Sequence, residues 1–236
     1  YNPEKENVYK KHMDKMKLDE IKAYNPDIND TNNNLKSNLN FNLKTANRLL
    51  SYKDKYLAVE AKTKVPWYMI ACIHQRESTA DFTTQLAQGD PLGQVSTHVP
   101  KGQGPYYGED AWERAALIAL EDVGLTKVID WRLEKIIYYW EKYNGWGYFN
   151  HGVPSAYVWA ASNQYTSGKY VSDGVWSPSA VDQQLGCAAI LKTLMELDNT
   201  IQPIRETKED VPIEPIIPLV PPTISIVISP PGSVRV

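Results

Sequence analysis

Apolar residues recur at helical spacing through most of the middle of the chain. From Asn42 to Lys62, the residues that fall near one face of a helix are Leu43, Ala46, Leu50, Leu57 and Ala61. Four more segments show the same period, at residues 66–78, 109–122, 130–145 and 177–197. Pro66 fits the first position of its helix, because the N–H that proline lacks would be unpaired there anyway. Five or six helices with few convincing strands predict a mainly α fold.

The composition changes twice along the chain, which divides it into three parts. Residues 1–40 are a polar N-terminal extension, and Asn25–Asn40 is too polar to build a core, so a loop or linker is expected there. Residues 41–200 carry nearly all the aromatic side chains and form the predicted domain. Residues 201–236 hold eight of the sixteen prolines and predict an extended tail. Within this tail, Thr223–Ser229 alternates like a strand that could join another sheet.

One segment inside the domain does not fit a helix. Asp81–Tyr107 is rich in Gly, Pro, Gln and Thr and is long for a connection, so an irregular lobe or binding loop is expected.

The overall composition gives no indication of two kinds of protein, nucleic-acid-binding proteins and membrane-spanning proteins. A net charge of −3 gives no electrostatic case for nucleic-acid binding, and no apolar run reaches the ~18 residues of a membrane span. Cys72 and Cys187 lie in apolar helical runs and indicate small core residues.

The stretch MIACIHQRESTADF, Met69–Phe82, raises a question about chemistry. Its apolar run turns polar at the end, and Glu77 falls in the last helical turn, where the negative end of the helix dipole disfavours a carboxylate. One interpretation is an exposed acid paired with Arg76 or Lys64. The other is a carboxyl in a cleft, whose pKa is raised by apolar neighbours so that it stays protonated near neutrality.

A second acid, Asp90, follows Glu77 in the irregular segment. One protonated and one ionised carboxyl, on a helix end and a facing loop, are what hydrolysis of a glycosidic bond requires. The sequence Gly-Asp-Pro around Asp90 is also an ordinary turn sequence, so both interpretations of Asp90 stay open.

The stretch Tyr143–Gly174 favours a sugar-binding function. It mixes Tyr, Trp, Asn, Ser and Gly with few aliphatic residues. Aromatic faces stack on sugar rings, and amides and hydroxyls bond their hydroxyl groups. The candidate substrate-binding residues are Trp146, Tyr148, Tyr157, Asn163 and Tyr165. For Tyr157 and Trp159, a place in the core is an equally good interpretation.

Other kinds of site are not indicated. His74, His98 and His151 are scattered, without the paired spacing of a metal site, so no metal ligands are expected. The glycine-rich GQGPYYGED lacks the strand and lysine of a phosphate loop. We therefore expect neither a metal nor another cofactor.

Several blocks of the sequence together resemble one family. They occur in one order between about Val65 and Leu194 and read IHQRES, QGDPL, THVPKGQGP, YNGWGY, GVPSAYVWAASNQYTSGKYVSDG and VDQQLGCA. The pattern resembles phage endolysins of the lysozyme-like muramidase family, which are distantly similar to goose-type lysozymes and soluble lytic transglycosylases. The chain departs from that pattern at Gln75 and at Asn163–Gln164, where the family is expected to have Asn-His.

The resemblance implies a mostly helical, lysozyme-like fold for residues 41–200. It also implies cleavage of the β-1,4 bond between N-acetylmuramic acid and N-acetylglucosamine in bacterial peptidoglycan. By the same resemblance Glu77 is the catalytic acid, Asp90 is the matching second acid, and Thr97 positions a water.

Three hypotheses stay open at this point: a muramidase, a lytic transglycosylase, and a virion structural protein that binds glycan strands without cleaving them. In the transglycosylase, the 6-hydroxyl of the sugar replaces water and only Glu77 is essential. In the virion protein, residues 201–236 would dock onto other phage tail proteins. We expect the protein to act at the bacterial cell wall or periplasm, carried in a virion or held in the host cytoplasm before lysis.

Overall fold

The computed structural model describes residues 33–98, 100–162, 164–172 and 174–203, with backbone only for 33–40. These residues belong to one unit of the chain, which ends at Arg205. Residues 1–32 and the proline-rich tail from residue 204, including Thr223–Ser229, lie outside the described part. The elements are α2 (Asn33–Ser51), α3 (Lys53–Thr63), α4 (Trp67–Ser78), α5 (Ala111–Asp122), the 3₁₀ helix η2 (Leu125–Lys127), α6 (Leu133–Asn144), α7 (Gly147–Asn150), α8 (Ala156–Trp159), β1 (Lys169–Ser172), β2 (Val175–Ser177) and α9 (Cys187–Leu197).

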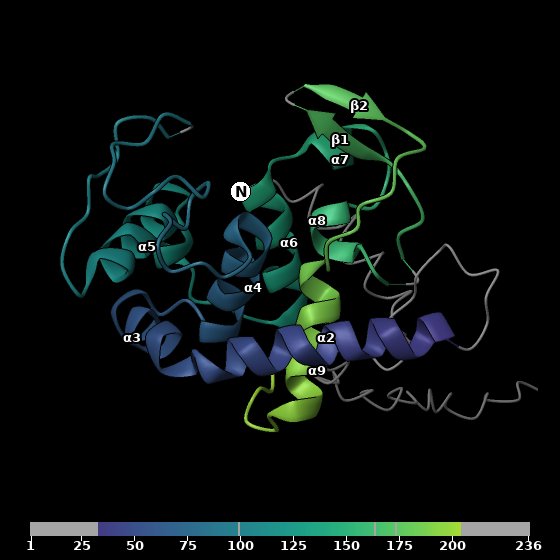
Figure 1. The fold of residues 1–236 in the computed structure, drawn as a ribbon, viewed down its shortest axis with the longest axis horizontal. Coiled ribbons are helices and arrows are strands. Elements are labelled where there is room, and N and C mark those ends of the chain that lie inside the picture. Colours follow the sequence, from purple (N-terminus) through teal and green to yellow (C-terminus); the bar gives the residue numbers. More distant parts are fainter. Residues whose placement is uncertain (1–32, 99, 163, 173, 204–236) are drawn as a thin grey trace, which may run out of the picture. The chain divides into compact units, whose positions relative to one another are not determined.

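Helix α4 lies at the centre of the described residues. It packs against α3 and α9, while α9 also contacts α2 and α8, and α8 contacts α6. In Figure 1, α5 and the irregular segment lie on one side of α4 and α6, and the hairpin of β1 and β2 lies on the other side. The prediction of a mainly α fold is therefore confirmed for the described residues.

Helix α4 is buried along most of its length, as its apolar sequence predicts. Residues Trp67 and 69–74 are all buried, and Pro66 precedes the first helical residue. The helix ends at Ser78, after which Thr79 and Ala80 both adopt left-handed backbone conformations, each with φ of 57°. Non-glycine residues rarely adopt this conformation, so two in succession mark a strained connection that begins two residues after Glu77.

The first predicted helix differs from the structure in two ways. Helix α2 already begins at Asn33, so the expectation of a loop through Asn40 is wrong for residues 33–40. The predicted helix 42–62 is also interrupted at Tyr52, between α2 and α3. The interruption rotates the second half. Its buried face consists of Tyr56, Val59 and Thr63, and the expected Leu57 and Ala61 are exposed.

The last predicted helix begins ten residues later than expected. Ser177 belongs to strand β2, where it pairs with Lys169 of β1, and α9 begins only at Cys187. Gly186, just before α9, explains part of the path of the chain. A Cβ atom there would lie 2.5 Å from the carbonyl oxygen of Val158, so the connection can pass this close to α8 only without a side chain.

The buried cysteines and histidine take structural positions. Cys72 and Cys187 are both buried and free. His74 is fully buried between Tyr56, Phe82 and Trp112, whose rings surround it. The Tyr56 hydroxyl lies 3.0 Å from Nδ1 of His74, and the Asp81 carbonyl lies 3.1 Å from Nε2. Burial lowers the pKa of His74 to about 4, so this ring is neutral at neutral pH.

Candidate active site

Glu77 lies in the last turn of α4, as the sequence predicts, and it contacts a tyrosine. The hydroxyl of Tyr157, on α8, donates a hydrogen bond of 2.9 Å to Oε1 of Glu77. Arg76 and Lys64, the two cations considered as partners of Glu77, bind other groups. Arg76 pairs with Asp182, and the Lys64 ammonium donates to the Ala61 carbonyl. The carboxyl of Glu77 is therefore held by a neutral donor.

The surroundings of Glu77 favour its protonated form. Burial raises the pKa of Glu77 from 4.5 to about 7, against the opposing effects of the Tyr157 hydrogen bond and the Arg76 charge. Tyr143, Tyr157 and Cys187 lie close enough for the Glu77 charge to raise the pKa of each, although burial is the largest cause for all three. A carboxyl with a pKa near the working pH suits general acid catalysis.

Arg76 and Asp182 form a buried ion pair beside Glu77. Nη2 of Arg76 lies 2.9 Å from Oδ2 of Asp182, and both side chains are 7% exposed. Nη1 of Arg76 donates to the carbonyl of Leu185 at 3.3 Å. The guanidinium carbon lies 5.0 Å from the ring centroid of Tyr157, within the range of a cation–π contact. Lys169 completes the group, with its ammonium 3.7 Å from Oδ1 of Asp182.

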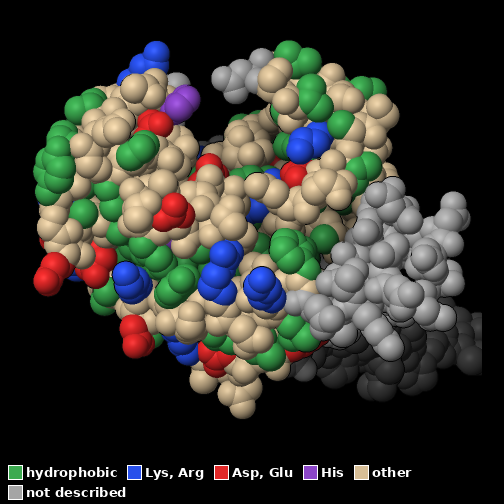
Figure 2. All heavy atoms as spheres, viewed as in Figure 1, with side chains coloured by type: hydrophobic (Ala, Val, Ile, Leu, Met, Phe, Trp, Pro, Cys, Tyr) green, Lys and Arg blue, Asp and Glu red, His purple; other side chains and the backbone are tan. Residues whose placement is uncertain are grey.

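The ion pair lines a pocket of about 670 Å³, a volume within the usual range of ligand sites. Aromatic, amide, hydroxyl and charged side chains share its lining, which consists of Arg76, Asn144, Gly147, Tyr148, Lys169, Tyr170, Val171, Ser172, Gly174, Asp182, Gln183 and Gln184. Glu77 itself does not line this pocket and is linked to it through Tyr157 and Arg76. Figure 2 shows the surface hollowed between the part with α5 and the part with the hairpin.

Four rings form one wall beside the pocket. His151 stacks on Trp176 with centroids 4.0 Å apart, and Trp176 meets the edges of Tyr148 and Tyr170 at 5.5 and 5.2 Å. Gly147 makes room for this group, because a Cβ atom at that position would lie 2.7 Å from the Tyr170 ring. The hairpin that carries two of these rings is thus fixed by ring packing.

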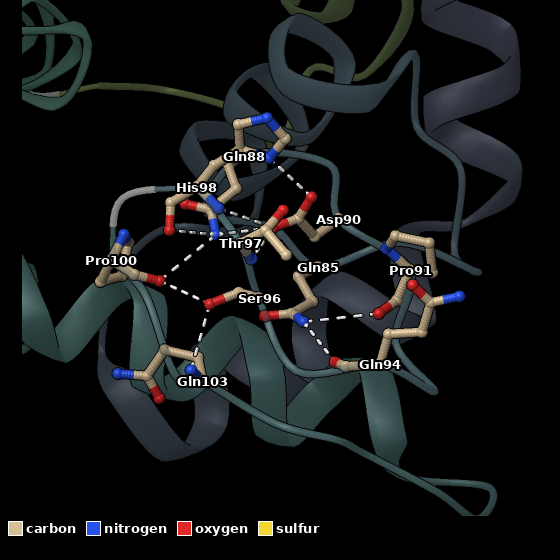
Figure 3. A network of polar contacts seen from close by, with 10 residues as sticks. All are labelled: Gln85, Gln88, Asp90, Pro91, Gln94, Ser96, Thr97, His98, Pro100 and Gln103. Carbon is tan, nitrogen blue, oxygen red and sulfur yellow. Dashed lines mark hydrogen bonds and ion pairs between the residues drawn. The ribbon is translucent and has the colours of Figure 1, made fainter.

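Asp90 is held inside the irregular segment, as Figure 3 shows. Its Oδ2 accepts hydrogen bonds from the backbone N–H groups of Thr97 at 2.9 Å and His98 at 3.2 Å, and from the Gln88 amide at 3.3 Å. Its Oδ1 lies 2.7 Å from Nδ1 of His98, whose side chain is 69% exposed. Most of the acceptor capacity of this carboxylate therefore serves the loop.

These donors decide the charge of Asp90. Burial raises its pKa, but the hydrogen bonds from His98 and Thr97 outweigh burial and hold the pKa below the ordinary value. Asp90 is therefore ionised at neutral pH, whereas Glu77 is partly protonated. The irregular segment also passes close to the backbone of α4 at this point, since a Cβ atom at Gly89 would lie 3.3 Å from the backbone carbonyl oxygen of Glu77.

The other residues predicted from the sequence have different surroundings. Thr97 is exposed and meets Asp90 through its backbone N–H. Tyr148 is buried and lines the pocket. Tyr165 is buried, and its hydroxyl bonds the Gly168 carbonyl and the Asp182 N–H. Trp146 is partly buried against Tyr138, with ring centroids 5.2 Å apart. Asn163 lies outside the described residues.

Several residues of the site were not among the sequence candidates. Arg76 and Asp182 were inside quoted blocks, yet only their pairing across 106 residues shows that they belong together. Tyr143 was within the aromatic stretch, and its hydroxyl bonds the Leu86 carbonyl at 3.2 Å. Lys169 and Tyr170 line the pocket from β1. Spacing gave no signal for these contacts, because each depends on how distant elements pack.

Within the described residues, no group of three or more His, Cys, Asp and Glu side chains is arranged to hold a metal ion. In the same part of the chain, no helix combines the length and apolar character that crossing a membrane requires. In comparisons with known proteins, no family model, no curated protein and no solved structure matches the chain.

Proposed function

We propose that this protein is a peptidoglycan hydrolase of the muramidase type, which cleaves the β-1,4 bond between N-acetylmuramic acid and N-acetylglucosamine. The observation that carries the proposal is Glu77: a carboxyl with a pKa of about 7, fixed by Tyr157, next to a polar pocket with an aromatic wall. The sequence blocks around these residues, which resemble phage endolysins, support the same function.

In the proposed reaction, Glu77 protonates the leaving glycosidic oxygen. Because Tyr157 donates to Oε1, the transferable proton is carried by Oε2. The bond from the anomeric carbon to that oxygen breaks, and positive charge develops on the muramyl ring. Asp90, which is ionised, stabilises this charge electrostatically. A water then adds to the anomeric carbon and releases its proton to the solvent, from which Glu77 is protonated again.

The pocket provides a place for the glycan strand beside the acid. Tyr148 and Tyr170 offer aromatic surface, and Asn144, Gln183 and Gln184 offer amides to sugar hydroxyl and acetamido groups. We therefore propose that glycan strands of the bacterial cell wall are the substrate and partner of this surface.

One observation favours a second candidate, a lytic transglycosylase. Asp90 already accepts hydrogen bonds from Thr97, His98 and Gln88, which leaves it less able to activate a water. In a transglycosylase the 6-hydroxyl of the muramyl sugar attacks instead, and Glu77 serves first as acid and then as base.

The test uses purified cell walls and mass spectrometry of the products. The full chain should release muropeptides with reducing ends if it is a muramidase, and 1,6-anhydro ends if it is a transglycosylase. Glu77→Gln should lower the rate by roughly 10²–10⁴-fold, the usual size of a general-acid contribution. Clearing by Glu77→Gln at a near-normal rate, or no glycan cleavage by the wild type, contradicts the proposal.

A further inference from the structure

We propose that Asp182 is a positioning residue for Glu77: it holds the Arg76 guanidinium in an ion pair, so that this cation stays on the Tyr157 ring and does not neutralise the Glu77 carboxylate. The inference rests on the proposed role of Glu77 as the proton donor. It assigns a role to a residue that lies 105 positions beyond that donor in the chain.

Arg76 and Glu77 contact the same tyrosine. The Arg76 guanidinium packs on the Tyr157 ring at 5.0 Å, and the hydroxyl of that ring donates to Glu77 at 2.9 Å. A cation this close to a carboxyl stabilises its ionised form, which is the wrong form for a proton donor. The pair with Asp182 at 2.9 Å gives the cation another carboxylate to bind.

The balance between Arg76 and Asp182 sets the charge felt by Glu77. The other groups that face Glu77 from the packed elements are Tyr143 on α6, Tyr157 on α8 and Cys187 on α9, and burial raises the pKa of each well above neutrality. They are uncharged at neutral pH. On α3, the Tyr56 hydroxyl contacts Nδ1 of His74, and the His74 ring is also neutral. Arg76 is thus the charge that opposes protonation of Glu77.

Asp182 is built to stay ionised and in place. Its backbone N–H donates to the Tyr165 hydroxyl at 3.0 Å, and its Oδ1 accepts from the Gln184 N–H at 3.0 Å. Burial raises its pKa, but Arg76 and the hydrogen bond from the Gln184 N–H outweigh burial and hold the pKa below the ordinary value. The aromatic stretch therefore supports the ion pair through Tyr165, which does not line the pocket.

The test follows the Glu77 carboxyl by ¹³C NMR in the full chain during a pH titration, without substrate. Asp182→Asn should lower the Glu77 midpoint by about 1 pH unit, because Arg76 is left without its partner. Arg76→Gln should shift the midpoint in the opposite direction. The double variant should return towards the wild type, since both charges are gone.

The matched control removes a different ion pair. Lys53 and Asp198 are 2.7 Å apart and neither was placed at the site, so Asp198→Asn should leave the Glu77 midpoint unchanged. If Asp182→Asn and Asp198→Asn behave alike, Asp182 is a stability residue only and the inference is wrong. If Asp182→Asn leaves an orphaned charge that prevents folding, the double variant and Asp182→Glu carry the test. A wild-type midpoint in Asp182→Glu supports the role, and an unshifted Arg76→Gln midpoint overturns it.

Activity then gives a second readout. In Asp182→Asn, the alkaline limb of the rate against pH should move to lower pH, so that kcat at pH 7 falls about fivefold, because the protonated fraction of Glu77 drops from about one half to about one tenth, while KM changes little. A rise in KM without a shift of the limb would instead mark Asp182 as a substrate contact and overturn the role. Because the NMR titration needs no turnover, shifted midpoints in a chain that cleaves no glycan would sink the proposed function alone.

Discussion

Replacing Glu77 by glutamine should stabilise the protein at alkaline pH, although it removes the proposed proton donor. The folded state holds the Glu77 proton more tightly than the unfolded chain, because its pKa is about 7 in place of 4.5. Between these values the folded state binds more protons, so the free energy of unfolding falls as pH rises through this window and levels off above it. Glutamine keeps the oxygen that Tyr157 bonds and carries no charge.

The size of the effect follows from the same two values. At 1.36 kcal/mol per pH unit, a pKa raised from 4.5 to about 7 corresponds to about 3 kcal/mol. Glu77 is partly exposed, so solvent screening reduces this to about 1–2 kcal/mol. The advantage of Glu77→Gln over the wild type should therefore grow by that amount between pH 5 and pH 8.

Urea unfolding of both proteins at pH 5 and pH 8 measures this difference. Other carboxyls titrate in both proteins and cancel. Asp130→Asn is the control, because Arg132 holds the pKa of Asp130 below its ordinary value and the carboxylate stays ionised across this range. The cost of Asp130→Asn should be the same at both pH values. An advantage of Glu77→Gln that does not change with pH would refute the claim that Glu77 is held protonated.

Three further outcomes test the site. Tyr157→Phe should raise the pKa of the candidate acid by about 1–2 pH units, since a hydrogen bond to a charged group is worth about 1.5–3 kcal/mol. The alkaline limb of the activity profile should then move to higher pH. Tyr143→Phe, which loses only a hydrogen bond to a backbone carbonyl, should leave that limb in place. Asp90→Ala should make the irregular segment sensitive to limited proteolysis, and Asp90→Asn, which keeps an acceptor, should not, if Asp90 organises the loop. Gly147→Ala should destabilise the protein by about 1–3 kcal/mol and alter its near-UV circular dichroism, because the new methyl group meets the Tyr170 ring; unchanged spectra would show that the ring wall is loose.

The sequence predicted those features of the structure that depend on residues close together in the chain. Pro66 set the start of α4, and the change from apolar to polar residues set its end, so Glu77 falls in the last turn as expected. The expectation of an unusual carboxyl at Glu77 also used local information, namely its position at the negative end of the helix dipole. Two of the three errors in the helices arose at Tyr52 and Ser177, where tertiary packing and strand pairing override a pattern that continues through them.

The site itself depends on contacts that no spacing reveals. Tyr157 was an equal candidate for the core and for the site, and it is buried while also bonding Glu77, so the two interpretations were not exclusive. Asp182 could not be singled out, because its partner Arg76 lies 106 residues away. Asp90 was weighed as an acid or a turn residue, and the structure gives it the hydrogen bonds of a turn and the charge of an acid.

The two sides of the hollow in Figure 2 are held together by different forces, and this has a consequence for motion. The hairpin side is joined by ring packing. On the other side, Leu86 anchors the start of the irregular segment in the core, but residues 93–98 and 100–103 are joined mainly by hydrogen bonds, including those to Asp90, with a small apolar cluster of Tyr106, Ala111 and Ala115 at their edge. Segments with few buried apolar contacts open at a lower free energy than the core. The Asp90 side should therefore exchange its amide hydrogens by local opening, whereas the hairpin side should exchange only when the core around α4 and α9 opens, so the two sides of the hollow differ in their motion.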